Sequence, residues 1–349
     1  MVSSSKRILL TGGAGYIGSH VALVLLERGH DLVVIDNLVN GHEEALDRVQ
    51  LLSGRSFEFQ RLDLLNRRDL MDMDCGRIDA VMHFAALKSV PLSVAQPLAC
   101  YQNNVSGTLH LLEFMAERGI NELVFSSSAA VYDASSPMPV TESSPLGPVS
   151  PYGRTKLMME KAIADCCAAR PQFRAVNLRY FNPVGAHESG RLGEDPLIEG
   201  GNLMPYILKA ASGHGPSLQV TGVDFDTADG SGVRDFIHVM DLAEAHASAL
   251  DCLQVGEAGC ELFNIGTGAG HSVLEVIAAF EQATGVKVPW VAAPRRPGDV
   301  DALFANVQKA NRMLGWQSRR SMSDACRDAW RWQQSHPSGF GAAKLESGA

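Results

Sequence analysis

A tyrosine and a lysine, Tyr152 and Lys156, stand four residues apart at the start of a segment with helical periodicity. That spacing places both side chains on one face of a helix. A free tyrosine has a pKa of about 10, and a neighbouring ammonium group lowers that value because it favours the phenolate. Such pairs are common on helix surfaces, but beside an oxidised dinucleotide this one predicts a base that removes a hydroxyl proton while hydride leaves.

A third candidate catalytic residue, Ser128, is the last of three serines that end the fifth predicted strand. In a parallel sheet the carboxyl ends of the strands form the edge at which ligands bind. We therefore expect the Ser128 hydroxyl to hydrogen-bond the same reacting oxygen as Tyr152.

A glycine-rich turn, Thr11 to Gly18, lies between the first predicted strand and the first predicted helix. Glycines allow the backbone to turn tightly and to approach a pyrophosphate, and the helix N-terminus offers free N–H groups to the anion. The strand–turn–helix context makes this pattern specific. It predicts a site for an NAD-type dinucleotide.

Acidic residues end the second and third predicted strands. Asp36 lies 18 residues after Gly18, where a carboxylate accepts hydrogen bonds from the adenosine ribose hydroxyls and repels a 2′-phosphate, so NAD is favoured over NADP. Asn37 and Asn40 continue that loop. Asp63 ends the third strand, where it is placed to meet the adenine amino group.

Alternating strands and helices must position these residues. We predict strands at 7–11, 31–36, 57–63, 80–85, 123–128 and 174–180, and helices at 15–28, 41–52, 103–118 and 152–169. This alternation is typical of a doubly wound, Rossmann-type α/β fold with a parallel sheet. We expect a dinucleotide-binding domain at 1–181, to which 236–266 return, a smaller α/β substrate lobe at 182–337, and a flexible tail at 338–349.

Composition narrows the class of protein. The 349 residues are 46% hydrophobic and carry a net charge of −9, which argues against a general nucleic-acid binder. Seven scattered cysteines without a C-x-x-C pair predict neither a disulfide framework nor a metal site. There is no secretory signal and no apolar stretch of about 18 residues. We expect a cytoplasmic enzyme without a membrane partner.

Over about residues 6–337 the chain resembles the UDP-glucose 4-epimerase group of the extended short-chain dehydrogenase/reductase family. The specific stretches include the turn at 11–20, His83 to Lys88, Ser126 to Tyr132, Ser150 to Lys156 and the run Arg179 to Ala186. The resemblance implies isomerase activity: Tyr152 takes the proton of the sugar 4-hydroxyl, hydride passes to tightly bound NAD, and the transient 4-keto sugar turns over before hydride returns. UDP-glucose and UDP-galactose are thereby interconverted.

The resemblance also assigns binding residues. Phe84 and Lys88 line the nicotinamide side, Asn103 and Phe181 complete the cofactor site, and a downstream set holds the UDP-hexose. The residues expected to bind the cofactor are Gly12, Gly15, Tyr16, Ile17, Gly18, Asp36, Asn37, Asn40, Asp63, Leu64, Phe84, Ala85, Lys88, Asn103, Ser128, Tyr152, Lys156 and Phe181. Those expected to bind the substrate are Lys88, Ser128, Tyr152, Asn182, Asn202, Leu203, Arg234, Arg296 and Asp299. The helices at 103–118 and 152–169 form a dimer interface in the family, which implies a homodimer.

Two positions depart from the family pattern. Thr221 stands where an aromatic residue usually stacks on uracil. Leu303 stands where a small residue widens the sugar pocket and a tyrosine narrows it, and for this reason we expect plain hexoses to be preferred over N-acetylated sugars.

Three other functions remain open. A sugar-nucleotide 4,6-dehydratase needs a carboxylate pair after the fifth strand, where this chain has Ser128, Ala129 and Ala130. An epimerase of another nucleotide sugar, such as a uronic acid, is a closer alternative. A non-catalytic NAD sensor would not need the Tyr152–Lys156 pair.

Overall fold

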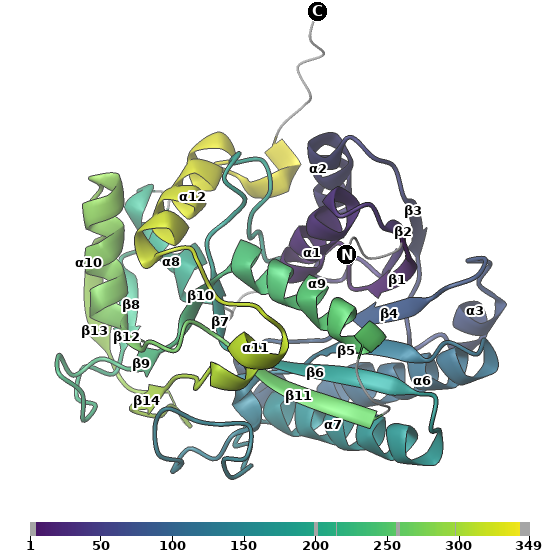
Figure 1. Cartoon of the computed structure of the whole chain (residues 1–349). Helices are drawn as coiled ribbons and strands as arrows, with labels where there is room; N and C mark the ends of the chain where they lie inside the picture. Colours follow the sequence, from purple (N-terminus) through teal and green to yellow (C-terminus); the bar gives the residue numbers. More distant parts are fainter. Residues whose placement is uncertain (1–4, 199–201, 214, 256–258, 297, 343–349) are drawn as a thin grey trace, which may run out of the picture.

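A seven-stranded sheet, parallel throughout, runs through the first lobe of the computed structural model (Figure 1). The structure describes residues 5–198, 202–213, 215–255, 259–296 and 298–342. The strand order is β11 (Gly259–Ile265), β6 (Arg174–Tyr180), β5 (Glu122–Ser126), β4 (Ala80–His83), β1 (Arg7–Thr11), β2 (Asp31–Asp36) and β3 (Glu58–Arg61). The order reverses at β1, and ligands of open α/β sheets bind at the carboxyl ends beside such a reversal.

Helices cover both faces of this sheet, which explains why its central strands are apolar on both sides. In β1, Ile8 and Leu10 pack toward α1 and α9, whereas Leu9 belongs to the opposite core, formed with α6 and α7. The predicted doubly wound α/β fold is confirmed. The first-lobe helices are α1 (Tyr16–Glu27), α2 (Glu43–Ser53), α3 (Arg67–Asp72), α4 (Val90–Ala95), α5 (Pro97–Tyr101), α6 (Gly107–Glu117), η2 (Ala129–Val131), α7 (Pro151–Ala169), α9 (Val239–Val255) and α11 (Gln308–Met313).

The predicted helix at 103–118 is interrupted. Its first residues form a π-helical turn, η1 (Gln102–Ser106), between α5 and α6. The wider turn places Asn104 in the interior while the neighbouring Asn103 lines a cavity. Single π turns of this kind often occur at functional sites.

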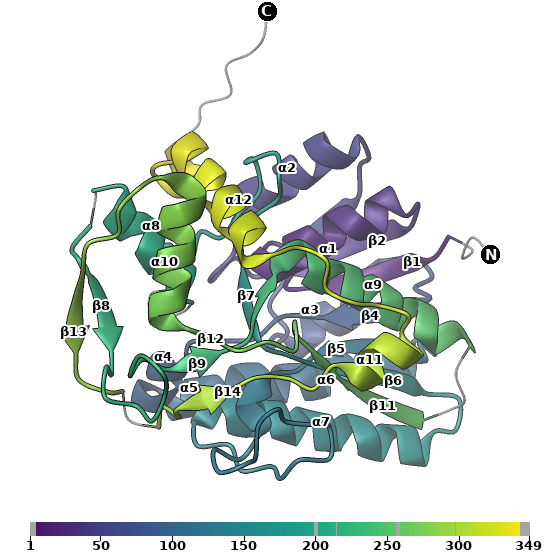
Figure 2. The same ribbon diagram turned by 60° about the vertical axis from the view of Figure 1, so that its left-hand side comes forward.

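The second lobe packs around α8, α10 and α12 (Figure 2). Between 182 and 235 the sequence predicts long loops around one helix near 203–211. The structure has that helix and adds short strands, which pair with strands distant in sequence. The elements outside the main sheet are β7 (Asn182–Val184), α8 (Leu203–Ala211), β8 (Leu218–Thr221), β9 (Val233–Arg234), β10 (Phe236–His238), β12 (His271–Ser272), α10 (Val273–Thr284), β13 (Trp290–Ala293), β14 (Ala302–Leu303), α12 (Met322–Ser335) and η3 (Gly339–Ala342).

The first residues of the expected flexible tail are packed. Phe340 in η3 is 3% exposed, and its backbone N–H donates to Asp195 at 2.9 Å. Burial of a phenylalanine side chain contributes about 2 kcal/mol, which fixes the chain here. The rest of the tail, residues 343–349, lies outside the described residues.

Candidate active site

The glycine-rich turn joins β1 to α1 at the carboxyl edge of the sheet. Helix α1 begins at Tyr16, and Gly15 caps it without any side-chain hydrogen bond. Gly15, Tyr16, Ile17 and Gly18 all line one cavity, so the positive end of the helix dipole faces it. The turn therefore offers an anion the N-terminus of a twelve-residue helix.

The three glycines of the motif are required for different reasons. Gly12 has a φ of +74°, and a side chain there would collide with the backbone of Ala85. A side chain at Gly18 would collide with the Gly12 carbonyl. At Gly15 an added Cβ would meet only that carbonyl, at an ordinary 3.5 Å. The protein itself leaves room at Gly15, and the open space suits a diphosphate lying against the backbone.

Asp36, at the end of β2, holds the turn from the other side. Its carboxylate accepts the backbone N–H of Ala14 at 3.0 Å and that of Leu38 at 2.8 Å. Burial raises the pKa of Asp36, and the two backbone hydrogen bonds lower it. The carboxylate lines the cavity with acceptor sites left for ribose hydroxyls.

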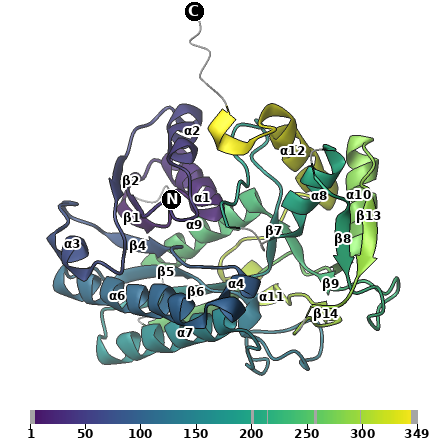
Figure 3. The same cartoon turned by 180° about the vertical axis from the view of Figure 1, so that it is seen from behind.

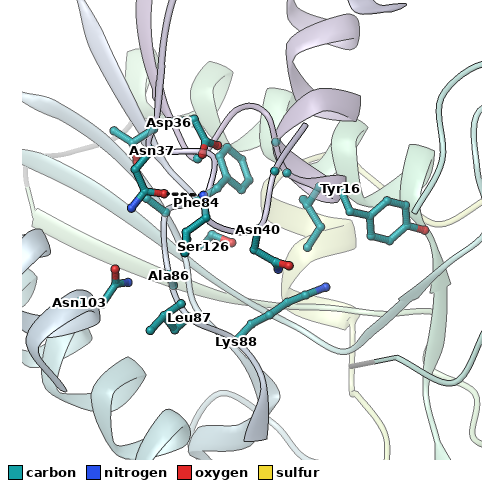
Figure 4. Close-up of a pocket in the computed structure, with 18 of the residues that line it drawn as sticks. Tyr16, Asp36, Asn37, Asn40, Phe84, Ala86, Leu87, Lys88, Asn103 and Ser126 are labelled. Carbon is teal, nitrogen blue, oxygen red and sulfur yellow. Dashed lines mark hydrogen bonds between the residues drawn. The ribbon is translucent and has the colours of Figure 1, made fainter. Parts of the chain in front are cut away.

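One open cavity of about 1080 Å³ collects most of the predicted site residues (Figure 4). Every residue predicted to bind the cofactor lines it except Ser128 and Phe181. Figure 4 shows Lys88 extending toward Tyr16, and its Nζ lies 5.9 Å from the centre of that ring. A cavity lined by a helix N-terminus and strand-end carboxylates has the groups that a dinucleotide needs for its diphosphate and its ribose hydroxyls.

Tyr152 and Lys156, on the first turns of α7, are both buried at the edge of this cavity. The Lys156 ammonium donates to the Ser126 carbonyl at 2.7 Å and lies 5.9 Å from the centre of the Tyr152 ring. Ser150 caps the helix through the Gly153 N–H, which fixes where the helix starts. The spacing in the sequence thus brings the pair together as predicted.

The protonation of this pair differs from the sequence expectation. Burial raises the pKa of Tyr152 well above its ordinary value, the nearby Tyr180 raises it further, and a hydrogen bond with Ser128 lowers it. Burial lowers the pKa of Lys156 to about 7, and the charges of Cys100 and Glu160 oppose that shift. Burial therefore opposes the lowering of the Tyr152 pKa that the sequence predicts, and positive charge near the phenol favours the phenolate.

A buried ion pair stands behind Lys156, one turn further along α7. Glu160 receives two hydrogen bonds from the Arg179 guanidinium, at 2.9 and 2.6 Å, and a third from the Ser127 hydroxyl. Such bidentate geometry is rigid. It ties α7 to β6 and to the serine run that follows β5.

Asn104 fixes the wall of the cavity that the loop after β4 forms. Its side-chain oxygen accepts the Leu87 N–H at 2.8 Å, and its amide donates to the Leu87 carbonyl at 3.1 Å and to Thr155 at 3.0 Å. The loop that carries Phe84 and Lys88 is thereby attached to α7. Sequence reasoning did not assign this positioning role to Asn104.

A second set of lining residues was also missed: Glu194, Asp195 and Pro196 enter the cavity from the second lobe. His42 Nε2 lies 2.9 Å from the Asp195 carbonyl, and Trp332 donates to the Glu194 carbonyl at 3.3 Å. This segment has no hydrophobic periodicity. Two adjacent carboxylates in a Gly- and Pro-rich loop were the only signal in the sequence.

Of the expected substrate residues, Lys88 and Tyr152 line this cavity, Ser128 lies in the first lobe just after β5, and the others lie on the second lobe outside the lining. Arg234 and Asp299 form an ion pair at 3.2 Å, and Arg296 is exposed beside them. Burial lowers the pKa of Arg234, and the charge of Asp299 opposes that shift. Asn202 caps α8 and hydrogen-bonds Glu194, which connects it to the cavity.

The two departures from the family pattern also lie on the second lobe or its border. Thr221 ends β8 beside β13, and the Arg295 guanidinium stacks over the neighbouring Phe225 ring at 4.1 Å. Leu303 packs against the small core that contains Phe181. Phe181 is therefore placed near the variable sugar position rather than in the dinucleotide cavity.

Two kinds of feature are missing from the described part of the chain. No group of three or more His, Cys, Asp or Glu side chains among these residues is arranged to hold a metal ion. None of the helices described is both long and apolar enough to span a membrane.

All seven cysteines are free thiols.

Solved structures resemble this one closely. A UDP-glucose 4-epimerase from Stenotrophomonas maltophila, with bound NAD and formylated UDP-arabinopyranose, has a TM-score of 0.91 and 46% identity, covering 95% of this chain and 99% of that one. A UDP-glucose 4-epimerase from Bifidobacterium longum, in complex with NAD⁺ and UDP, has a TM-score of 0.91 and 43% identity, covering 96% of this chain and 100% of that one.

Sequence relatives give the same answer. A UDP-glucose 4-epimerase from Erwinia amylovora is 50% identical, covering 95% of this chain and 99% of its own length. One from Dictyostelium discoideum is 48% identical, covering 96% and 97%. A model of the NAD dependent epimerase/dehydratase family matches residues 8–266. The chain therefore belongs to the NAD dependent epimerase/dehydratase family.

Proposed function

We propose that this protein is a UDP-glucose 4-epimerase that inverts C4 of UDP-glucose and UDP-galactose through a transient 4-keto sugar. The observation that carries the proposal is one cavity holding both a glycine-rich helix N-terminus and the buried Tyr152–Lys156 pair. The two full-length relatives described above, both UDP-glucose 4-epimerases at about half identity, support the same reaction.

Separate groups of residues bind the cofactor, transfer the proton and bind the substrate. Gly15 and the N-terminus of α1 would hold the cofactor diphosphate, and Asp36 would hold the adenosine ribose. When bound, NAD supplies a hydride acceptor and the positive charge of its oxidised ring. That charge and the Lys156 ammonium favour the phenolate, so Tyr152 takes the proton of the 4-hydroxyl and later returns it. Ser128 hydrogen-bonds the same oxygen, and Arg234 and Arg296 attract the substrate diphosphate.

Turnover without added cofactor tests this function. The purified protein is incubated with UDP-glucose, UDP-galactose and their N-acetylated counterparts, and the products are separated by chromatography. We expect interconversion of the two hexoses with no added NAD and slower reaction of the N-acetylated sugars. Absence of interconversion in a protein that contains NAD would overturn the proposal.

Replacing Asp36 by asparagine should weaken NAD binding about tenfold or more, because a charge-assisted hydrogen bond contributes about 1.5–3 kcal/mol. Loss of the negative charge should also reduce the ratio of the affinity for NAD to the affinity for NADP. Calorimetric titration of cofactor-free protein measures both affinities. Asp31→Asn is the matched control, since Asp31 lies at the far end of the same strand and is 60% exposed. An unchanged NAD affinity in Asp36→Asn would contradict the role of this carboxylate.

We also propose a cytoplasmic homodimer formed through α6 and α7, which lie side by side along one edge of the molecule (Figure 3). Leu109 on α6 is 43% exposed and Met158 on α7 is 48% exposed. The double variant Leu109→Glu/Met158→Glu should be a monomer by light scattering, because charges cannot be buried without partners. Val291→Glu, at an apolar position 50% exposed on β13, is the control and should leave the dimer intact. A double variant with the same mass as the unmodified protein would refute this interface.

A further inference from the structure

Glu194 connects the two lobes through a single carboxylate oxygen. Its Oε1 lies 3.3 Å from the Lys88 ammonium of the first lobe and accepts the Asn202 side-chain amide of the second at 2.7 Å. The Glu194 side chain is 6% exposed and lines the dinucleotide cavity. One buried atom thus contacts a residue expected to meet the cofactor and another expected to meet the nucleotide sugar.

The other oxygen of the same carboxylate, Oε2, is buried and has no hydrogen-bond partner among the residues that the structure describes. A half-satisfied buried carboxylate is unfavourable for folding, because desolvation costs more than a single ion pair returns. Burial accordingly raises the pKa of Glu194, while Lys88 and Asn202 lower it. A well-packed apolar residue would serve stability better, so a role in stability does not explain this arrangement.

Preorganisation of the Lys88 side chain explains the buried Glu194 carboxylate better than a role in stability does. The Lys88 side chain is 30% exposed and has four rotatable bonds, so ordering it on binding costs free energy. Its contact with Glu194 orders it in advance. The backbone of Glu194 is itself fixed by Trp332, which donates to its carbonyl at 3.3 Å.

We propose that Glu194 is a positioning residue that holds Lys88 where it meets the cofactor and Asn202 where it meets the nucleotide sugar, so that the NAD site and the UDP-sugar site are coupled through one carboxylate. This inference rests on the proposed function for the identity of the two ligands. Loss of the carboxylate should weaken both ligands, through Lys88 for the cofactor and through Asn202 for the nucleotide.

Binding measurements on Glu194→Gln test the coupling without relying on turnover. We expect the affinity of the NAD-loaded protein for UDP, measured by calorimetry, to fall about tenfold, and the dissociation of NAD, followed by gel filtration, to become about tenfold faster. Because the effect on UDP runs through Asn202, the double variant Glu194→Gln/Asn202→Ala should bind UDP no more weakly than the weaker single variant.

Glu261→Gln is the control, since it breaks another lysine–glutamate pair, with Lys309 at 2.9 Å, away from the cavity. It should leave both measurements within twofold. The proposal is overturned if Glu194→Gln keeps both its affinity for UDP and its rate of NAD loss within twofold of the unmodified protein. Additive losses of UDP affinity in the double variant would also overturn it. If Glu194→Gln does not fold, a double-mutant cycle of Lys88→Met and Asn202→Ala tests the coupling. We expect non-additive losses of affinity, and additive losses would overturn the proposal. A protein that binds NAD and UDP but does not interconvert the sugars would overturn the proposed function alone.

Discussion

Tyr152→Phe should lower the rate of UDP-galactose interconversion about 10³-fold, within the usual range for loss of a general acid–base group. The phenol is the group placed to take the hydroxyl proton, and phenylalanine keeps the ring that fills the buried site. Affinity for NAD and for UDP should stay within a fewfold of the unmodified protein, because neither depends mainly on this hydroxyl. The loss should therefore lie in kcat.

A coupled assay for UDP-glucose formation measures the rate, and absorbance at the nucleotide bands measures bound cofactor. Tyr101→Phe makes the same chemical change at the end of α5, outside the cavity lining, and should leave the rate unchanged. Turnover by Tyr152→Phe within tenfold of the unmodified protein would show that another group is the base.

Local patterns account for the part of the site that the sequence predicted. The strand–turn–helix unit around Gly12, Gly15 and Gly18 depends on neighbours in the chain, and the four-residue spacing of Tyr152 and Lys156 needs only a helix. The sheet likewise follows from alternating segments, because short parallel strands joined by helices allow few arrangements. The fold class and the dinucleotide cavity could therefore be predicted from the printed residues.

Long-range packing accounts for what was missed. Glu194 reaches Lys88 across 106 positions, and Asn104 reaches Thr155 across 51, and no periodicity connects such pairs. For the same reason, the pKa values of buried groups could not be predicted from the sequence. The sequence places an ammonium near the Tyr152 phenol but does not give the burial that raises the pKa of one group and lowers that of the other.

Burial of Lys156 has a consequence for stability that depends on pH. Burial lowers the pKa of this ammonium from its ordinary value of 10.5 to about 7 in the fold. Below about pH 7 the side chain is charged in both states, and the fold bears the whole cost of the buried charge. As the pH rises from 7 toward 10.5, the folded protein has lost the proton while the unfolded chain keeps it, so the cost shrinks.

Lys156→Met should therefore raise the free energy of unfolding of the cofactor-free protein by a few kcal/mol at pH 6 and by clearly less at pH 9. Loss of the 2.7 Å hydrogen bond to the Ser126 carbonyl offsets about 1 kcal/mol at both pH values. Urea denaturation at the two pH values measures the difference. The same variant should lose most of its activity, because the positive charge beside Tyr152 is removed.

Lys161→Met replaces an exposed lysine on the same helix and should change stability equally at pH 6 and pH 9. If Lys156→Met also changes the free energy of unfolding equally at pH 6 and pH 9, burial does not control the charge of Lys156. If its stabilisation decreases with rising pH as expected, the fold gives up stability to keep an ammonium under the phenol. A catalytic base explains such a cost, whereas a protein that only senses NAD has no need of it.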